Sequence, residues 1–235
     1  MKFAITGISL RHDDELGLIR NGFQTVKIPP CKAVSGAVST HADLLLFFLR
    51  DKLFLPKDYY TCNSVLIDEI LRAGGLSPVL TRDIPRSPYP HEVPLCALNI
   101  SDAAVIASKK HIAPEIVRYC EDSSIPILNT NQGYAKCTAA YMEGIISADR
   151  STLSAAKANN IPCLEISQGN VLLDGYPYGF IGGASGFDGQ NIYFCGNVDL
   201  HPDGHIIKAF CDGNGIGCIS LSDLPLYDIG SIFFI

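Results

Sequence analysis

The sequence lacks the long features that mark membrane proteins and nucleic-acid-binding proteins. None of its apolar runs approaches the roughly 20 residues of a membrane-spanning helix. Lysine and arginine form no cluster, and the net charge of −6 argues against a nucleic-acid partner. The apolar segment 1–5 is too short for the core of a signal peptide. We therefore expect a soluble, cytoplasmic protein that binds neither membranes nor nucleic acids, and its oligomeric state stays open.

Cysteine pairs of the kind that bind zinc or act as redox motifs are also missing. The chain has nine cysteines, but no two of them are separated by two residues. This spacing argues against a zinc ribbon and against a dithiol redox motif. Most of the cysteines lie in apolar stretches, as Cys163 does, so we expect free, buried thiols.

A nucleotide-binding fingerprint is not present either. The glycine-rich segment 213–217 follows a predicted helix and precedes a predicted strand, which is the reverse of the dinucleotide-binding order. Asp199, His201 and His205 suggest a metal site, but Pro202 and Gly204 interrupt the pattern, so a helix N-terminus is expected there. The sequence predicts no cofactor and no metal ion.

What the sequence does contain is a repeated order of short segments. Residues 34–80 predict strand, strand, helix, strand, and the same order recurs in 95–128, 135–166 and 178–221. Residues 226–235 and 3–28 are left over, and joined in space they complete a fifth unit. Periods of about 45 residues are typical of closed repeat architectures, and splitting one unit between the termini removes exposed sheet edges. We predict one α/β domain, 1–235, in which five ββαβ units form a propeller-like ring; the alternative is an open α/β sheet.

A polar pair precedes one of the apolar runs. His41 and Asp43 stand just before the continuous apolar segment 44–48, which predicts a strand buried on both faces. Residues two apart in a strand lie on the same face, so we expect both side chains at the centre of the ring.

Five short sequence motifs resemble those of a known family: STHAD at 39–43, NQGYAKC at 131–137, YGFIGGASG at 178–186, GNVDLHPDG at 196–204 and DIG at 228–230. The chain resembles the pentein, or guanidine-modifying enzyme, fold of arginine deiminases, agmatine deiminases, dimethylargininases and amidinotransferases. It resembles more closely an uncharacterised bacterial family of that fold. The resemblance covers nearly the whole chain and implies a pentein-type ring of five units.

The characterised enzymes hold a guanidinium group between carboxylates, attack its carbon with a cysteine and move protons with a histidine. The resemblance places His41 at the position of that histidine, with Ala42 where the nucleophile stands. It also places Asp228 at a carboxylate position, with Leu226 where a neighbouring histidine stands. In a second alignment frame, His41 and Asp43 themselves form the family's His-x-Asp motif.

The glycine pair Gly182-Gly183 matches a motif in which acidic residues flank two glycines, but Ile181 and Ala184 occupy the flanking positions. Lys136 and Cys137 match an Arg-Asp position of the enzymes. The ordinary catalytic set is therefore incomplete.

Several roles stay open. Cys137 is a nucleophile, with a thiol pKa lowered by Lys136 if both reach one cavity, or it is a core residue. His41 and Asp43 are an acid/base pair or a structural pair. Asp228 holds a cationic ligand or caps a turn.

We expect one central cleft that binds a small polar molecule carrying an amino, guanidino or ureido group. Its predicted lining is His41, Asp43, Lys136, Cys137, Gly182, Gly183, Ser185 and Asp228, with Lys136 free to hold a carboxylate tail. One alternative is a cysteine-dependent C–N hydrolase or amidinotransferase that uses Cys137 and His41, with Asp43 orienting the histidine. The other alternative is a non-catalytic binding or interaction protein.

Overall fold

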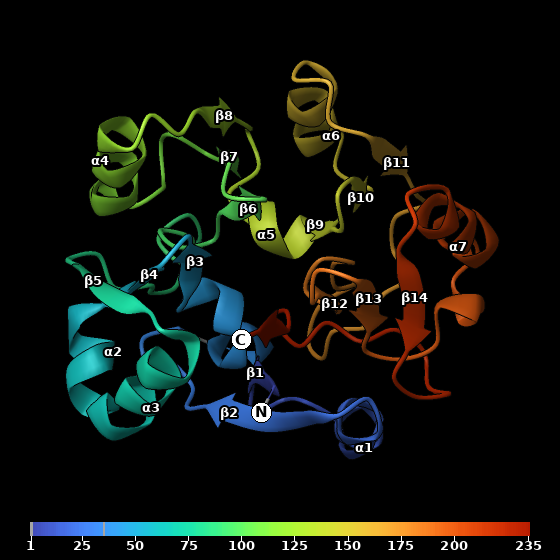
Figure 1. The fold of residues 1–235 in the computed structure, drawn as a ribbon, viewed down its shortest axis with the longest axis horizontal. Coiled ribbons are helices and arrows are strands. Elements are labelled where there is room, and N and C mark those ends of the chain that lie inside the picture. The colour runs from blue at the N-terminus through green and yellow to red at the C-terminus, as the bar shows by residue number, and fades with distance from the viewer. Residues whose placement is uncertain (1, 35) are drawn as a thin grey trace.

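A computed structural model describes residues 2–34 and 36–235 of the chain. Figure 1 shows small sheets arranged in a ring, with most of the helices on its outside. The described residues form five sheets of three strands each. In every sheet the middle strand pairs antiparallel with one neighbour and parallel with the other. Each unit therefore has two antiparallel strands followed by a helical crossover to a parallel strand, which is the predicted ββαβ order.

The first two units occupy the lower and left part of Figure 1. One combines the two ends of the chain: β15 (Phe233–Phe234), β1 (Lys2–Gly7), α1 (His12–Arg20) and β2 (Phe23–Ile28). The next begins with two short 3₁₀ turns and contains η1 (Ala37–Thr40), η2 (Ala42–Leu44), β3 (Phe47–Leu49), β4 (Lys52–Pro56), α2 (Lys57–Cys62), α3 (Ser64–Gly74) and β5 (Ser77–Thr81).

The other three units complete the ring. The third contains β6 (Leu98–Ile100), β7 (Ala104–Ala107), α4 (Pro114–Asp122) and β8 (Ile127–Asn129). The fourth contains α5 (Ala135–Thr138), β9 (Ala139–Tyr141), β10 (Ile145–Ser147), α6 (Arg150–Lys157) and β11 (Cys163–Glu165). The fifth contains β12 (Ser185–Phe187), β13 (Asn191–Phe194), η3 (Val198–Leu200), α7 (Gly204–Gly213) and β14 (Gly217–Ser220).

Local sequence explains the outer helices. Helix α3 buries Ile67, Ile70 and Leu71, which recur at helical spacing, and it ends at Gly75 in the left-handed conformation that glycine favours. Helix α6 begins where the Asp149 side chain accepts a hydrogen bond from the backbone N–H of Thr152 at 2.7 Å. Among the described residues, no helix is both long and apolar enough to cross a membrane.

The two ends of the chain close the ring. Strand β15 pairs antiparallel with β1, so that Phe234 lies opposite Ala4 and Phe233 opposite Ile5. Figure 1 shows the C-terminus on the lower inner side of the ring, next to β1. The predicted fold class, a ring of five ββαβ units closed by the N- and C-terminal segments, is confirmed.

The predicted strand at the polar pair is wrong. His41 lies between the 3₁₀ turns η1 and η2, and β3 begins only at Phe47. Lys136 and Cys137 likewise lie in the short helix α5 instead of a strand. The repeat also predicts that the unit 178–221 begins with a strand and that the leftover segment 226–235 supplies one. In the structure β12 begins only at Ser185, and the segment 226–235 forms only the two-residue strand β15.

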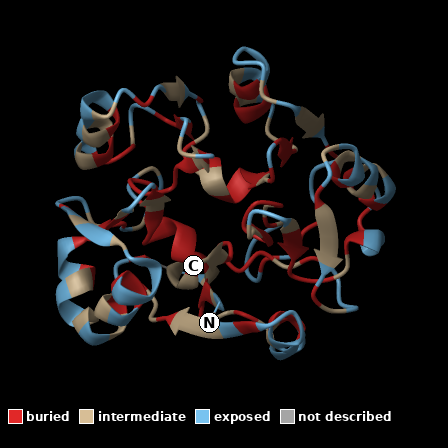
Figure 2. Ribbon diagram, viewed as in Figure 1, coloured by how far each residue is buried: buried red, intermediate tan, exposed pale blue. Residues whose placement is uncertain are grey.

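These errors share one physical cause. Before its first strand, each unit sends a segment to the middle of the ring: residues 42–46, 93–97, 135–138, 181–184 and 226–232. Nearly all of the residues in these segments are buried, which Figure 2 shows as red ribbon toward the inside of the ring. Protein surrounds these segments on all sides, so continuous apolar character does not require a strand there. We call these five stretches the hub segments.

Candidate functional site

Glycines allow the hub segments to approach one another closely. A Cβ atom on Gly183 would lie 1.9 Å from Oδ1 of Asp228, a distance that no side chain could occupy. Gly230 has φ +77°, and a Cβ there would lie 2.3 Å from the Cα of His41. Both positions require glycine, one for close approach and the other also for its backbone conformation.

Asp228 is one of two almost fully buried carboxylates of the hub, with Asp43. Its side chain is 1% exposed, and its two oxygens accept hydrogen bonds from the backbone N–H groups of Phe180 at 2.8 Å and Gly230 at 3.0 Å. Nε2 of His41 lies 3.7 Å from Oδ1. Burial raises the pKa of Asp228, and the nearby His41 opposes this effect. The carboxylate is therefore held rigidly but lacks a full counter-ion.

A second carboxylate is linked to a lysine through a serine. The hydroxyl of Ser231 donates to Oδ2 of Asp43 at 2.7 Å and accepts from Nζ of Lys136 at 2.9 Å. The carbonyl oxygen of Gly182 lies 3.0 Å from the same hydroxyl and accepts from Nζ at 3.3 Å. Burial lowers the pKa of Lys136, and the charge of Asp43 opposes this shift. Ser231 joins the two charged groups, and it is not among the residues predicted from the sequence because a lone serine after a glycine carries no motif.

Cys137 is a buried thiol in contact with another thiol. Its Sγ lies 3.4 Å from Sγ of Cys96. Burial raises the pKa of Cys137, the hydrogen bond with Cys96 adds to the shift, and the charge of Asp43 adds further. The pKa of Cys137 therefore lies above its ordinary value although Lys136 is its neighbour in the chain, and Lys136 does not line the inner cavity with it. The thiol is therefore neutral at neutral pH in the absence of a ligand.

Three of the predicted site residues meet at one cavity of about 230 Å³, which we call the inner cavity. His41, Cys137 and Asp228 form its polar part. Its walls are largely aromatic and include Tyr134, Tyr176, Tyr178 and Phe180. A small cavity with a few converging polar groups on an apolar surface is typical of a small-molecule site.

The remaining predicted residues are placed differently. Lys136 and Ser185 line a second cavity of about 610 Å³, bordered by residues of β3, β6, β12 and β15. The other three contact lining residues of one cavity or the other. A carboxylate oxygen of Asp43 lies within 4.8 Å of a ring nitrogen of His41 and of the Cys137 sulfur. The carbonyl oxygen of Gly182 accepts a hydrogen bond from Nζ of Lys136. Gly183 packs against the Asp228 side chain. The predicted residues thus surround the hub, but they do not line a single cleft.

Tyr134 is fixed in the wall of the inner cavity by a buried acid. Its hydroxyl donates to Glu92, a 6%-exposed residue that also accepts from Ser87. Its ring stacks on Tyr89, with centroids 5.5 Å apart. Burial raises the pKa of Tyr134, and the hydrogen bond to Glu92 raises it further. The ring is therefore pre-positioned, which the sequence alone could not indicate because these residues are distant along the chain.

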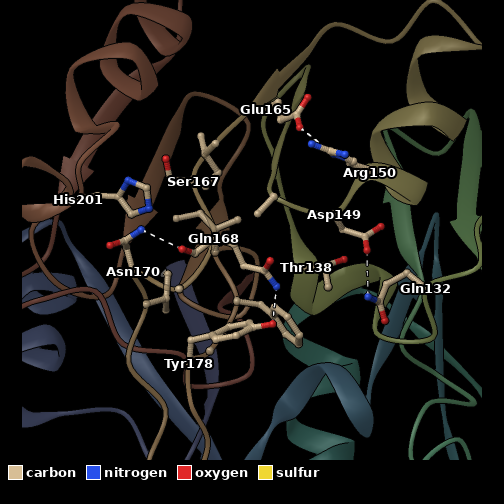
Figure 3. Close-up of a pocket in the computed structure, with 17 residues that line it drawn as sticks. Gln132, Thr138, Asp149, Arg150, Glu165, Ser167, Gln168, Asn170, Tyr178 and His201 are labelled. Carbon is tan, nitrogen blue, oxygen red and sulfur yellow. Dashed lines mark hydrogen bonds and ion pairs between the residues drawn. The ribbon is translucent and has the colours of Figure 1, made fainter.

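A third, larger space adjoins the inner cavity. Figure 3 shows this outer cavity of about 470 Å³, with Tyr178 at its floor and Gln132, Asp149 and Arg150 along one side. Tyr178 and Phe180 line both the inner and the outer cavity, so the two are neighbours. The charged pair Arg150–Glu165, 3.4 Å apart, has side chains that are 90% and 50% exposed. Such a solvated pair adds little binding energy, so the buried groups of the inner cavity are the stronger candidates.

Solved structures of guanidine-modifying enzymes have the same fold. A variant of the DDAH from Pseudomonas aeruginosa, in complex with citrulline, matches with a TM-score of 0.54 at 8% identity, covering 94% of this chain and 92% of that one. The agmatine deiminase of C. jejuni matches with a TM-score of 0.55 at 9% identity, covering 94% and 87%. An amidinotransferase from Microseira wollei matches with a TM-score of 0.50 at 9% identity, covering 90% and 76%.

Identities this low show a common fold and leave the reaction open. No curated protein matches the chain in sequence. A family model does match, over residues 8–233, and it describes a family of unknown function, DUF6873. The chain therefore belongs to the DUF6873 family and has the pentein fold.

Proposed function

We propose that the inner cavity binds a small organic cation that carries an amino or guanidino group. The charge of the hub supports this proposal. It contains two buried carboxylates, Asp43 and Asp228, but one ammonium group, and that ammonium is linked through Ser231 to Asp43. A buried negative charge without a full counter-ion is costly, and a bound cation would supply the missing charge. Asp228 is the carboxylate that lines the cavity.

The walls of the cavity suit the same ligand class. Aromatic faces attract a cation through their quadrupole, and Tyr134, Tyr176, Tyr178 and Phe180 all border this space. The volume of about 230 Å³ fits a compound of the size of a single amino acid or amine. Pentein-fold structures have been solved with citrulline and with the substrate of an agmatine deiminase bound, which supports a nitrogen-rich small molecule.

The test is isothermal titration calorimetry with agmatine, arginine, citrulline and simple guanidines. We expect a guanidino or amino compound to bind, and Asp228→Asn to weaken its binding by at least tenfold. Tyr176→Ala should weaken binding about two- to fivefold, the range of an exposed cation–π contact. Tyr176 is 44% exposed, so this variant tests the wall with little effect on folding.

Glu165→Gln is the matched control. It also changes a carboxylate to an amide, but on the outer cavity, and should leave the affinity unchanged. No heat with any of these compounds, or equal affinities of Asp228→Asn and the wild type, would count against the proposal. A loss of affinity in Glu165→Gln alone would move the site to the outer cavity.

One observation favours a catalytic role as a second candidate. The Cys137 sulfur and a His41 ring nitrogen lie within 4.8 Å of each other, and both residues line the inner cavity. In this proposal His41 removes the thiol proton and Cys137 attacks the carbon of a guanidino group. A C–N bond of that group then breaks as His41 returns the proton to the leaving ammonia or amine. Water, in a C–N hydrolase, or an acceptor amine, in an amidinotransferase, finally displaces the sulfur.

Ammonia or amine release from the bound compound tests this candidate. We expect Cys137→Ala to abolish turnover while it keeps ligand binding. Cys195→Ala, which removes a buried thiol elsewhere in the core, should leave turnover unchanged. Equal turnover of Cys137→Ala and the wild type would exclude the candidate. Binding without turnover in the wild type would leave a non-catalytic binding protein.

A further inference from the structure

We propose that His41, Asp43 and Cys137 form a site for one divalent transition-metal ion of the zinc type at the hub. A ring nitrogen of His41, a carboxylate oxygen of Asp43 and the sulfur of Cys137 all lie within 4.8 Å of one another. Imidazole, carboxylate and thiolate are the three ligand types that proteins use for zinc. The inference does not rest on the binding of an organic cation by Asp228, but it gives His41 and Cys137 a role other than base and nucleophile.

Two polar atoms without partners point to a missing ligand. Nε2 of His41 and Oδ1 of Asp43 are buried, and neither has a hydrogen-bond partner within residues 2–34 and 36–235. The side chains are 2% and 1% exposed, so water does not solvate them from outside. Nε2 lies 3.7 Å from Oδ1 of Asp228, which is beyond hydrogen-bonding distance. A metal ion would satisfy both atoms together.

The distances are close to those of a coordinated ion. Ligand atoms around tetrahedral zinc lie about 3.3–3.8 Å apart, given metal–ligand bonds of about 2.0–2.3 Å. Two ligand atoms that lie 4.8 Å apart must therefore approach each other by about 1–1.5 Å to bind one ion. His41 and Cys137 line the inner cavity, so the fourth position of the ion would face that space. Three protein ligands and one open position are typical of zinc sites that bind an exogenous molecule.

The surroundings support the ligands. Ser231 donates to Oδ2 of Asp43 and is itself bonded to Lys136, which leaves Oδ1 free for the ion. Sγ of Cys96, 3.4 Å from Sγ of Cys137, is placed to donate a hydrogen bond to the thiolate. The charges balance: the divalent ion binds neutral His41, the Asp43 carboxylate and the Cys137 thiolate, and one thiol proton is released per ion.

The experiment uses the wild-type chain, freed of metal by a chelator, kept reduced and measured without organic ligand. Zinc titration by calorimetry in two buffers of different ionisation enthalpy should show one ion per chain and about one proton released. Cobalt should give a thiolate-to-cobalt charge-transfer band and visible bands of tetrahedral intensity. The absence of both zinc binding and the cobalt bands in the wild type would overturn the site without any variant.

Conservative variants then assign the ligands, with folding checked by circular dichroism. His41→Gln, Asp43→Asn and Cys137→Ser should each lower zinc affinity at least tenfold, and Cys137→Ser should also remove the charge-transfer band. Cys96→Ser should keep the band. Cys211→Ser is the matched control, since it breaks a different hydrogen-bonded thiol pair, Cys211–Cys218, and should change nothing. Unchanged affinity in Cys137→Ser, or loss of the site in Cys211→Ser, would refute the assignment. Because Asp228→Asn leaves all three ligands in place, it should keep zinc binding even if it loses the organic ligand.

Discussion

Gly183 and Gly213 are two glycines in opposite situations, and this contrast predicts opposite effects of the same substitution. At Gly183 a Cβ would meet the Asp228 carboxylate at 1.9 Å, whereas at Gly213, near the end of α7, no described atom lies within 4 Å. Gly183→Ala should lower the free energy of unfolding by about 1–3 kcal/mol through overpacking. Gly213→Ala should raise it by about 0.5–1 kcal/mol, since alanine favours the helix. Urea unfolding measures both, and an unchanged stability of Gly183→Ala would show that the hub can expand.

Ser231 combines a left-handed backbone with a hydroxyl that two charged groups use. Its φ is +72°, an uncommon value for a residue with a side chain. Ser231→Ala removes the bonds to Asp43 and Lys136 and should destabilise the protein by about 1–3 kcal/mol. Ser231→Gly removes the same bonds but suits the backbone, so it should be about 1 kcal/mol less harmful. Equal stabilities of the two variants would show that the backbone strain is negligible.

At the scale of elements, the first turn of α7 depends on a neutral histidine. Nδ1 of His201 accepts a hydrogen bond from the backbone N–H of Asp203 at 3.0 Å, and its Nε2 is buried without a partner in the described part of the chain. Burial lowers the pKa of His201, and Asp203 opposes this shift. The unfolded chain therefore binds a proton more readily than the folded one, and folding stability falls as the pH drops below about 6.5.

Thermal melting between pH 5 and pH 8 tests this expectation. His201→Asn keeps an acceptor for the Asp203 N–H but cannot gain a charge, so its melting temperature should fall less in acid than that of the wild type. His205→Gln, an exposed histidine on the same helix, is the control and should follow the wild type. Parallel curves for all three proteins would contradict a neutral, buried His201.

At the scale of the whole molecule, the stability of the first unit depends on the far end of the chain. Backbone bonds join Phe3 and Ile235 in both directions, at 2.9 and 3.1 Å, and β15 covers what would otherwise be an open edge of β1. Removing residues 233–235 should lower the urea midpoint and expose the β1 amides. Hydrogen exchange should become faster in residues 2–7 and change little in β13, which serves as an internal reference. Full protection of β1 in the shortened chain would show that ring closure contributes little.

The sequence alone predicted the five-unit ring because each unit contains its own local signals. Apolar periodicity marks α3, and Gly75 ends this helix in the conformation that glycine favours. These signals act over a few residues, so they can be read without knowing the rest of the structure. The remaining segments, 3–28 and 226–235, were then expected to pair, since neither of them completes a sheet by itself. The sequence likewise predicted three site residues from their side-chain chemistry and from the short motifs that contain them: His41, Cys137 and Asp228. The structure brings these three residues to one cavity.

Only the tertiary structure decided what the hub looks like. The hub segments are buried because five units surround them. Their continuous apolar residues therefore predict strands, although the segments form turns and short helices. The link from Ser231 to Asp43 and Lys136, the thiol contact of Cys96 with Cys137, and the separation of Lys136 from the inner cavity all join residues far apart in the chain. Such contacts depend on how the five units pack against one another around the ring, and no local sequence pattern predicts this packing. The sequence by itself therefore determined the units and their order, whereas packing around the axis determined the site.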